Sequence, residues 1–244
     1  MKIAVITDPH GNLPALRCVQ EDMADQKVDE VWCLGDVIGY GADPWECWRI
    51  SRDEMKAKTL MGNHENALID AKSMMDFNYA AVAGVEFALM TAPAGTAEEI
   101  AALPQTLEFS EYGAAIAHGS FSGDNFNYIY EKEAPGELNF APSAINFIGH
   151  THKPLCYAMT AGRVKVAKID SINLDQKDKY LINPGSVGQP RDKDNRAAYG
   201  ILEIKAYGKS FAWRRVAYPI REAAESIRKA GLPEKLALRL YIGE

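Results

Sequence analysis

Short apolar runs separated by polar turns dominate the chain, and helical spacing of apolar residues is found mainly in the first half. The run Ile3–Thr7 is rich in β-branched residues, which is typical of a buried strand. Leu13–Met23 follows with apolar residues at helical spacing, and Glu30–Leu34 is the next predicted strand. The chain therefore begins with the alternation of strands and helices that is typical of an α/β protein.

The rest of the first half is predicted to be mostly helical, with one short strand. The predicted elements are a helix over Trp45–Ser51, a strand over Thr59–Met61, a helix from Asn63 to about Asp70, and helical structure over Phe77–Leu103. Asn63 stands where a helix cap is expected, and Pro93 breaks the last segment.

The second half changes to short β segments separated by turns that contain Gly, Asn or Asp. Strands are predicted near Leu107 and over Ala114–Ala117, Ile145–Ile148, Leu155–Met159, Arg163–Ile169, Tyr180–Ile182, Ala198–Lys205 and Lys209–Val216. A final helix is predicted over Arg221–Ala230. No linker-like segment, change in composition or internal repeat marks a boundary, so we expect one α/β domain over residues 1–244, with two sheets between helices.

Composition and charge narrow the class of protein. The 244 residues are 47% hydrophobic and 25% charged, which argues against a disordered or collagen-like chain. The formal net charge is −6, and no basic stripe is present, so neither a long nucleic acid nor an anionic membrane surface is an expected partner. A small anion would bind only at a site that supplies its own positive charge.

The sequence gives no indication of secretion or of a membrane span. The N-terminal apolar run is too short for the core of a signal peptide, and Asp8 interrupts it. No stretch reaches the roughly 18 apolar residues that a membrane-spanning helix needs. The four cysteines form no Cys-x-x-Cys pair, so we expect reduced thiols and a cytoplasmic location.

The five histidines share one pattern. Each lies beside Gly, Asp, Asn or Thr and shortly after an apolar run, and none lies on an apolar helical face. Asp8 and His10 follow the first predicted strand, and Asp36 follows the second. The carboxyl ends of strands are where α/β sheets bind ligands. The remaining members of the pattern are Asn63, His64, His118, His150 and His152.

The residue types in this pattern indicate a metal site. Carboxylate, imidazole and amide oxygen together suit divalent ions such as Mn, Fe, Zn, Co or Ni. Seven ligand candidates are too many for one ion, so we expect two ions that share a carboxylate and activate a water between them. The seven candidates are Asp8, His10, Asp36, Asn63, His118, His150 and His152.

Each short motif taken alone has a simpler explanation. Asp-x-His and Gly-Asp are common in turns, and Gly-Asn-His-Glu is also found at the capped start of a helix. The motif Gly149–His152 is more specific, because its two histidines would face the same side of an extended chain. Five such motifs, each after a short apolar run, favour a metal site over coincidence.

In this ordered set the sequence resembles the calcineurin-like metallophosphoesterases. Their signature is Asp-x-His, Gly-Asp, Gly-Asn-His-[Asp/Glu], a later His and Gly-His-x-His, and the resemblance covers residues 2–191. The segment Asn183–Arg191 resembles a branch that includes YfcE-type phosphodiesterases. The loop Gly35–Gly41 resembles a longer subgroup described as diadenosine-tetraphosphatase-like.

The resemblance implies a fold and a role for each site residue. The expected fold is a four-layer αββα sandwich of two mixed β-sheets flanked by helices. One metal ion would be held by Asp8, His10, Asp36 and His152, and the other by Asp36, Asn63, His118 and His150. His64 would bind no metal and would act as the general acid that protonates or stabilises the leaving oxygen.

The expected reaction is the hydrolysis of a small phosphodiester or a nucleotide-type phosphate ester. Two divalent ions outweigh the charges of Asp8 and Asp36, so the site attracts an anion although the protein is acidic. Three further residues are candidates for substrate binding. Arg191 would form a forked contact with a phosphate, and Tyr40 would stack on a base. Asn12 would bond to the site, unless it caps the next helix.

Two alternatives stay open. A phosphomonoesterase that acts on phosphoprotein, or a nucleotide pyrophosphohydrolase, would have the same residues. A non-catalytic scaffold of the same fold, such as a retromer subunit, is expected to lose ligands or the catalytic histidine, and this sequence retains both. The sequence has no G-x-S-x-G, P-loop or G-x-G-x-x-G motif that would indicate another class of enzyme.

Overall fold

Two six-stranded sheets make up the β structure in the computed structural model, which describes residues 1–124, 126–167 and 170–244. The first sheet contains β1 (Lys2–Ile6), β2 (Glu30–Cys33), β3 (Lys58–Thr59), β9 (Ser171–Leu174), β11 (Ala197–Lys205) and β12 (Gly208–Val216). The second contains β4 (Thr106–Phe109), β5 (Ala114–Ala117), β6 (Ile145–Phe147), β7 (Leu155–Thr160), β8 (Arg163–Val166) and β10 (Lys179–Asn183). Their strand orders are β3-β2-β1-β11-β12-β9 and β4-β5-β6-β10-β7-β8.

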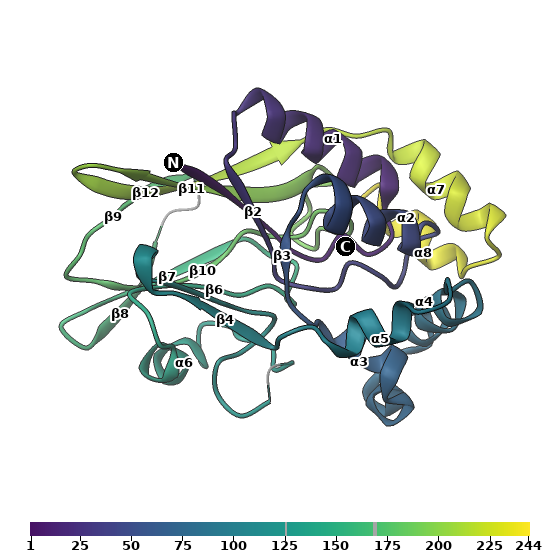
Figure 1. The fold of residues 1–244 in the computed structure, drawn as a ribbon, viewed down its shortest axis with the longest axis horizontal. Helices are drawn as coiled ribbons and strands as arrows, with labels where there is room; N and C mark the ends of the chain where they lie inside the picture. Colours follow the sequence, from purple (N-terminus) through teal and green to yellow (C-terminus); the bar gives the residue numbers. More distant parts are fainter. Residues whose placement is uncertain (125, 168–169) are drawn as a thin grey trace.

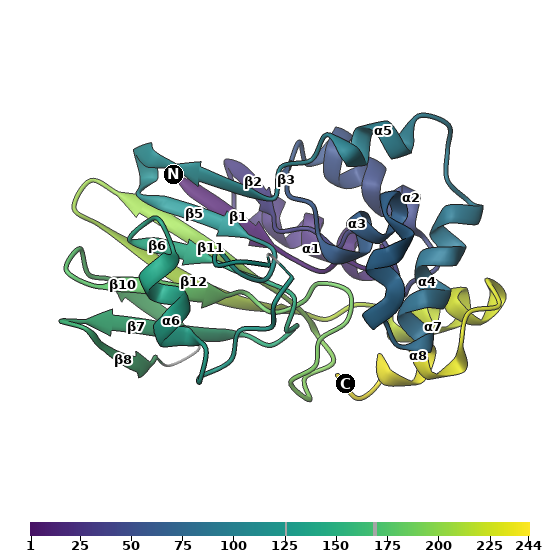
Figure 2. The ribbon, with the colours of Figure 1, turned by 90° about the horizontal axis from the view of Figure 1, so that it is seen from below.

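Helices cover the outer faces of both sheets and gather at one end. They are α1 (Leu13–Asp25), α2 (Pro44–Arg49), α3 (Asn63–Ile69), α4 (Tyr79–Met90), α5 (Thr96–Ala101), α6 (Ala134–Phe140), α7 (Ile220–Lys229) and α8 (Glu234–Arg239). Figure 1 shows α1 above the first sheet and α6 below the second, and both helices contact these sheets. The layers therefore run α, β, β, α, which confirms the predicted sandwich. Figure 2 shows α2, α3, α4, α5, α7 and α8 together at one end of the sheets. Within the described ranges, no helix has both the length and the apolar character that crossing a membrane requires.

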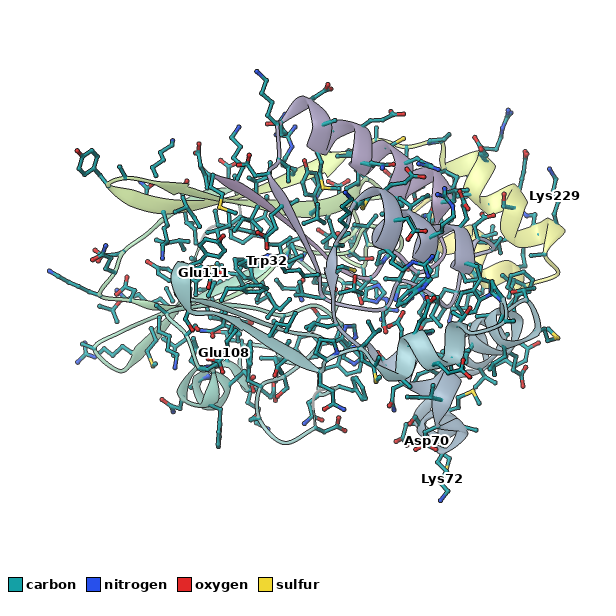
Figure 3. All side chains as sticks on the ribbon, viewed as in Figure 1. Trp32, Asp70, Lys72, Glu108, Glu111 and Lys229 are labelled. Atoms are coloured by element: carbon teal, nitrogen blue, oxygen red, sulfur yellow. The ribbon has the colours of Figure 1, made fainter. Side chains whose placement is uncertain are left out.

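Large apolar side chains fill the space between the two sheets. Ile3 and Val5 of β1 belong to this cluster, while the alternate residues of the strand pack on the helical side. Trp32 of β2 is fully buried here and stacks on Phe109, with 3.9 Å between ring centroids. Figure 3 shows Trp32 in the interior, whereas Lys229 projects from the far end of α7. Because both faces of β1 and β2 are buried, these strands are continuous apolar runs in the sequence.

Each sheet has three parallel strands whose carboxyl ends lead toward the same region. These strands are β1, β2 and β3 in the first sheet and β5, β6 and β10 in the second. Backbone hydrogen bonds join the loops that follow them. Within the first sheet the amide of Asp8 donates to Gly35 O at 3.1 Å, and between the sheets the amide of Val187, after β10, donates to Thr7 O at 3.0 Å. The fold therefore brings polar loops from both sheets together.

Most predicted elements are present, with small shifts of their boundaries. The segment Phe77–Leu103 is divided into α4 and α5 around Pro93, as predicted. The strand predicted over Arg163–Ile169 ends at Val166, and its residues 168–169 lie outside the described residues.

Among the α-helices and strands of the described residues, three short elements lie where none was predicted, namely α6, α8 and β9. β9 pairs with β12, α8 packs on α7, and α6 packs on β10 and β7. Elements of this length gain their stability from tertiary contacts more than from local preference, which explains why the sequence pattern does not indicate them.

The residue that caps α3 is Gly62, so the prediction of Asn63 as the cap was wrong. The backbone of Gly62 is extended, and its amide donates to Glu65 Oε2 at 3.0 Å. The Glu65 carboxylate therefore accepts a hydrogen bond from the cap residue, as the third helical residue does in a capping box, although glycine has no side chain to complete the motif. Asn63 becomes the first helical residue, and its Oδ1 lies 3.1 Å from His118 Nε2.

Candidate metal centre

The loops at the carboxyl ends of the strands bring seven polar side chains into one buried cluster. The first sheet and α3 supply Asp8, His10, Asp36 and Asn63, and the second sheet supplies His118, His150 and His152. These are the seven ligand candidates of the sequence, and all of them are buried. Residues that are far apart along the chain thus form a single site.

The backbone of the site is strained. Its residues with a left-handed backbone are Asp8, His10, Asp36, Tyr40, His150 and His152, with φ between 48° and 64°. They are six of the ten non-glycine residues with positive φ among those that the structure describes. Each such residue costs about 1–3 kcal/mol, and strain of this kind is typically concentrated at functional sites.

This backbone also corrects a prediction about the motif Gly149–His152. The two histidines were expected to face the same side of an extended chain, but φ is 64° at His150 and 57° at His152. The turn directs His150 toward His118, with Nδ1 3.2 Å from Nε2, and directs His152 toward His10. The two histidines therefore join different halves of the cluster.

His10 and His152 face each other through ring nitrogens that carry no proton. His10 Nδ1 lies 2.9 Å from Ile38 O, and His152 Nδ1 lies 2.6 Å from Gln189 O. A carbonyl oxygen only accepts, so each Nδ1 carries the proton and each Nε2 carries a lone pair. Burial holds the pKa of both rings well below its usual value, so both are neutral. The two Nε2 atoms are 3.1 Å apart, and two lone pairs at this distance repel unless a cation binds both.

Asp8 adds a carboxylate to this pair. Its Oδ1 lies 3.4 Å from His152 Nε2 and 3.8 Å from His10 Nε2, and it has no hydrogen-bond partner in the described part of the chain. Its Oδ2 accepts from Thr7 Oγ1 at 2.7 Å and from the amide of His150 at 3.2 Å. Burial raises the pKa of Asp8 to about 7. A buried, unpaired carboxylate oxygen beside two unprotonated imidazoles fits a divalent cation.

Asp36 and His118 form the second half of the cluster. Asp36 Oδ2 lies 3.3 Å from His118 Nε2 and 3.6 Å from His10 Nε2, so one oxygen reaches both halves. Burial lowers the pKa of His118, but the charge and hydrogen bond of Asp36, the charge of Asp8 and the bond to Leu34 O together outweigh burial and raise this pKa to about 9. This half of the cluster therefore favours a positive charge.

The ligand atoms of the cluster form three overlapping groups, and the atoms of each group lie within 4.8 Å of one another. The groups are Asp8, His10 and His152; His10, Asp36 and His64; and Asp36, His118 and His150. Donor sets of nitrogen and carboxylate oxygen at this spacing fit divalent metal ions.

His64 lies at the edge of the cluster and is held mainly by packing. Its ring centroid is 4.7 Å from that of Tyr40, 5.0 Å from that of Phe77 and 4.8 Å from that of His10. Its amide donates to Asp36 Oδ1 at 2.9 Å, while its Nδ1 is buried without a partner among the described residues. Burial lowers the pKa of His64 to about 4, so the ring is neutral near pH 7.

Two residues that shape the site were not singled out from the sequence. Glu65 is buried, and its carboxylate accepts from the amides of Asp36 at 2.7 Å and Ile38 at 3.1 Å, which fixes the loop that carries Asp36. Gly39 has a φ of +88°, and a Cβ at this position would clash with His64 Nδ1. Both belong to motifs that the sequence shows, but their contacts follow only from the fold.

A cleft of about 330 Å³ opens onto the cluster, a size suited to a small ligand. Of the three candidates for substrate binding, Tyr40 and Arg191 line this cleft. Both polar atoms of the Asn12 side chain are bonded to backbone: Oδ1 accepts from the amide of Ala15 at 3.2 Å, and Nδ2 donates to Gly188 O at 2.8 Å. Asn12 therefore caps α1, which was the favoured one of the two roles predicted for it.

Comparison with known proteins finds similar sequences and a similar fold. Residues 1–207 match the calcineurin-like phosphoesterase superfamily domain. The chain is 33% identical to an uncharacterized protein of Methanocaldococcus jannaschii, over 99% of this chain and 98% of that protein. The crystal structure of a metallophosphoesterase from Sphaerobacter thermophilus is similar, with a TM-score of 0.85 and 32% identity over 100% of this chain and 99% of that one. A symmetrical bis(5′-nucleosyl)-tetraphosphatase of Actinobacillus pleuropneumoniae is 34% identical over 71 residues, 28% of this chain and 26% of that protein.

Proposed function

Because the chain belongs to the calcineurin-like phosphoesterase superfamily, we propose that it uses two divalent metal ions to hydrolyse a small phosphodiester or nucleotide-type phosphate ester. As a member of this superfamily, the protein is a hydrolase that acts on phosphoester bonds. The observation that carries the metal dependence is the pair of unprotonated Nε2 atoms of His10 and His152, 3.1 Å apart beside Asp8 Oδ1, which has no hydrogen-bond partner in the described part of the chain.

Two sets of side chains would hold the ions. The first set is Asp8, His10, Asp36 and His152, and the second is Asp36, Asn63, His118 and His150. The position of Asp36 Oδ2 between His10 Nε2 and His118 Nε2 supports its role as the shared ligand. When bound, two such ions stabilise negative charge on phosphoryl oxygens and lower the pKa of water at the site.

His64 would act as the general acid. It lines the cleft beside Asp36, and Tyr40 and Phe77 fix the plane of its ring. The ring is neutral before substrate binds, because burial lowers its pKa to about 4. An anionic phosphate ester in the cleft favours the protonated ring and so raises this pKa, which prepares His64 to protonate the leaving oxygen.

Arg191 and Tyr40 would bind the substrate. Arg191 Nε is buried without a partner among the described residues, while one of its terminal nitrogens donates to Gln189 Oε1 at 2.9 Å. The guanidinium therefore retains donors for a phosphate oxygen. The aromatic side chains Phe77, Phe126 and Tyr128 also line the cleft and suit a flat group such as a nucleobase, which supports a nucleotide-type substrate.

A panel of substrates tests the proposed function. Protein loaded with Mn, Co, Ni or Zn would be assayed with bis-p-nitrophenyl phosphate, p-nitrophenyl phosphate and diadenosine tetraphosphate. We expect metal-dependent turnover that is faster on the diester or the dinucleotide than on the monoester. Faster turnover of the monoester would support a phosphomonoesterase instead, and a metal-poor, inert protein would support a scaffold.

The affinity for metal is expected to rise with pH. His118 has a pKa of about 9 and Asp8 a pKa of about 7 without metal, so each holds a proton below its value that the metal must displace. The affinity should therefore increase up to about tenfold per pH unit toward pH 9, with a steeper rise below about pH 7, and then level off. Isothermal titration with Mn²⁺ in buffers of different ionisation enthalpy measures both the affinity and the protons released. An affinity that does not change over this range would contradict the assignment.

The substitution Gly39→Ala is expected to reduce turnover without loss of metal. A Cβ at this position displaces the ring of His64, and a shift of this kind lowers kcat by about a hundredfold. Gly95→Ala is the matched control, because Gly95 has a similar φ of +86° but no atom within 4 Å of a Cβ. Metal content and kcat of both variants would be compared. Equal activity of the two variants would show that the position of His64 does not limit turnover.

A further inference from the structure

In the described ranges, most arginines are paired with carboxylates, and the exceptions are informative. Eight of the eleven form an ion pair with an Asp or Glu side chain. Arg163 is exposed on β8. Arg191 and Arg239 are partly buried, and in the described ranges no Asp or Glu side chain forms an ion pair with either.

Arg191 and Arg239, which form no ion pair with an Asp or Glu side chain in the described ranges, meet at one aromatic ring. The guanidinium carbon of Arg191 lies 5.7 Å from the centroid of the Tyr40 ring, and that of Arg239 lies 5.9 Å from it. The same ring is 4.6 Å from the ring of His10 and 4.7 Å from that of His64. The Tyr40 ring therefore lies near both guanidinium groups and near two histidines of the candidate metal centre.

Arg239 is brought to this place by the C-terminal helices. It ends α8, beyond residues 1–207 that match the superfamily domain. Burial and the charge of Arg191 lower the pKa of Arg239 to about 10, so its guanidinium stays charged at neutral pH. Its Nε donates to the main-chain oxygen of Glu244, and the face of Tyr40 gives partial compensation. The charge of Arg191 acts on Arg239 and lowers its pKa, so the two guanidinium groups repel each other, and an anion that contacts both removes this repulsion.

We propose that Arg191 and Arg239 form a second anion subsite, which binds a phosphate group next to the scissile one. The preferred substrates then carry at least two phosphates in series, as a nucleoside polyphosphate does. This inference rests on the proposed function, because the metal centre is taken to bind the scissile phosphate. A guanidinium presents parallel N–H donors that match phosphate oxygens, and the Nε of Arg191, which has no partner among the described residues, is such a donor.

Binding of two nucleotides that differ by one phosphate tests this subsite. The probes are AMP and the non-hydrolysable α,β-methylene-ADP, titrated calorimetrically into Mn²⁺-loaded protein with equal free Mn²⁺ in cell and syringe. The variants are Arg239→Gln, Arg239→Lys and the control Arg228→Gln. Arg228 lies in the same pair of C-terminal helices but forms an ion pair with Glu234 on the surface.

If the subsite exists, loss of Arg239 should lower the affinity for the nucleotide with two phosphates much more than the affinity for AMP. Wild-type protein should bind α,β-methylene-ADP more tightly than AMP, and Arg239→Gln should weaken the former about tenfold while changing AMP less than about twofold. Arg239→Lys should retain most of the affinity because it keeps the charge, and Arg228→Gln should behave like wild type. If Arg239→Gln loses affinity equally for both nucleotides, Arg239 has only a structural role. If it loses no affinity for α,β-methylene-ADP, the subsite is likewise refuted.

The binding readout also separates this inference from the proposed function. If the wild-type protein hydrolyses no phosphate ester but shows the selective loss, the subsite stands and the proposed function fails. If it hydrolyses bis-p-nitrophenyl phosphate but Arg239→Gln binds α,β-methylene-ADP as tightly as wild type, the subsite alone fails.

Discussion

Replacing Asp36 with alanine is expected to remove both metal ions together and to lower phosphoester hydrolysis by about a thousandfold or more. Asp36 Oδ2 lies 3.3 Å from His118 Nε2 and 3.6 Å from His10 Nε2, so the substitution takes one oxygen from both halves of the cluster. It also removes the Oδ1 that accepts from the amide of His64, so the start of α3 loses an anchor. Mass spectrometry of bound metal and turnover of bis-p-nitrophenyl phosphate measure the two effects.

Two matched variants make this result specific. Asp8→Ala should weaken mainly one ion, because Asp8 Oδ1 lies near His10 and His152 but belongs to no group with His118. Asp25→Ala changes an exposed carboxylate at the end of α1 and should leave metal content and activity as in wild type. Two bound ions in Asp36→Ala would contradict the role of Asp36 as the shared ligand.

The second large effect is expected for His64→Gln, which should keep both ions but lower turnover by about 10²–10⁴-fold. Asn63, His118 and the other ligand candidates keep their own contacts in this variant, so metal content should match that of wild type. Glutamine retains hydrogen-bonding groups but cannot deliver a proton near neutral pH. The measurements are kcat and metal content on the same preparation.

The dependence on the leaving group identifies the role of His64 more closely. A general acid matters most when the leaving oxygen is strongly basic, so His64→Gln should lose more activity on an alkyl ester than on a p-nitrophenyl ester. An equal loss on both esters would indicate a positioning role. Parent-like turnover on both would rule out His64 as the general acid.

Much of the site could be predicted from the short motifs, because each motif consists of neighbouring residues at the end of one strand or the start of one helix. Asp8 follows β1, Asp36 follows β2 and His118 follows β5, and all three strands were recognisable as apolar runs. Parallel strands have their carboxyl ends at the same edge, so the convergence of Asp8 and Asp36 follows from the fold class. His118 belongs to the second sheet, and it joins them because the two sheets pack face to face. The four-layer sandwich was predicted from the family resemblance and is present in the structure.

The errors have identifiable physical causes. Asn63 was taken as a cap because asparagine commonly has this role, but Glu65 bonds the amide of Gly62 and frees Asn63 to face His118. The histidines of Gly149–His152 were expected on an extended chain, but tertiary contacts hold both in the left-handed region. In both cases a local preference was outweighed by contacts with distant residues.

Periodicity and turn chemistry act over a few residues, so the amino-acid sequence was enough to predict the order of most strands and helices and the types of donor atom that end each strand. Which donors face each other depends on tertiary packing, as with the lone pairs of His10 and His152. It also decided that Gly39 leaves space for His64 and that Arg239 of the last helix reaches Tyr40. These contacts join residues far apart along the chain, and their geometry is fixed by the packing of whole layers and not by any local pattern.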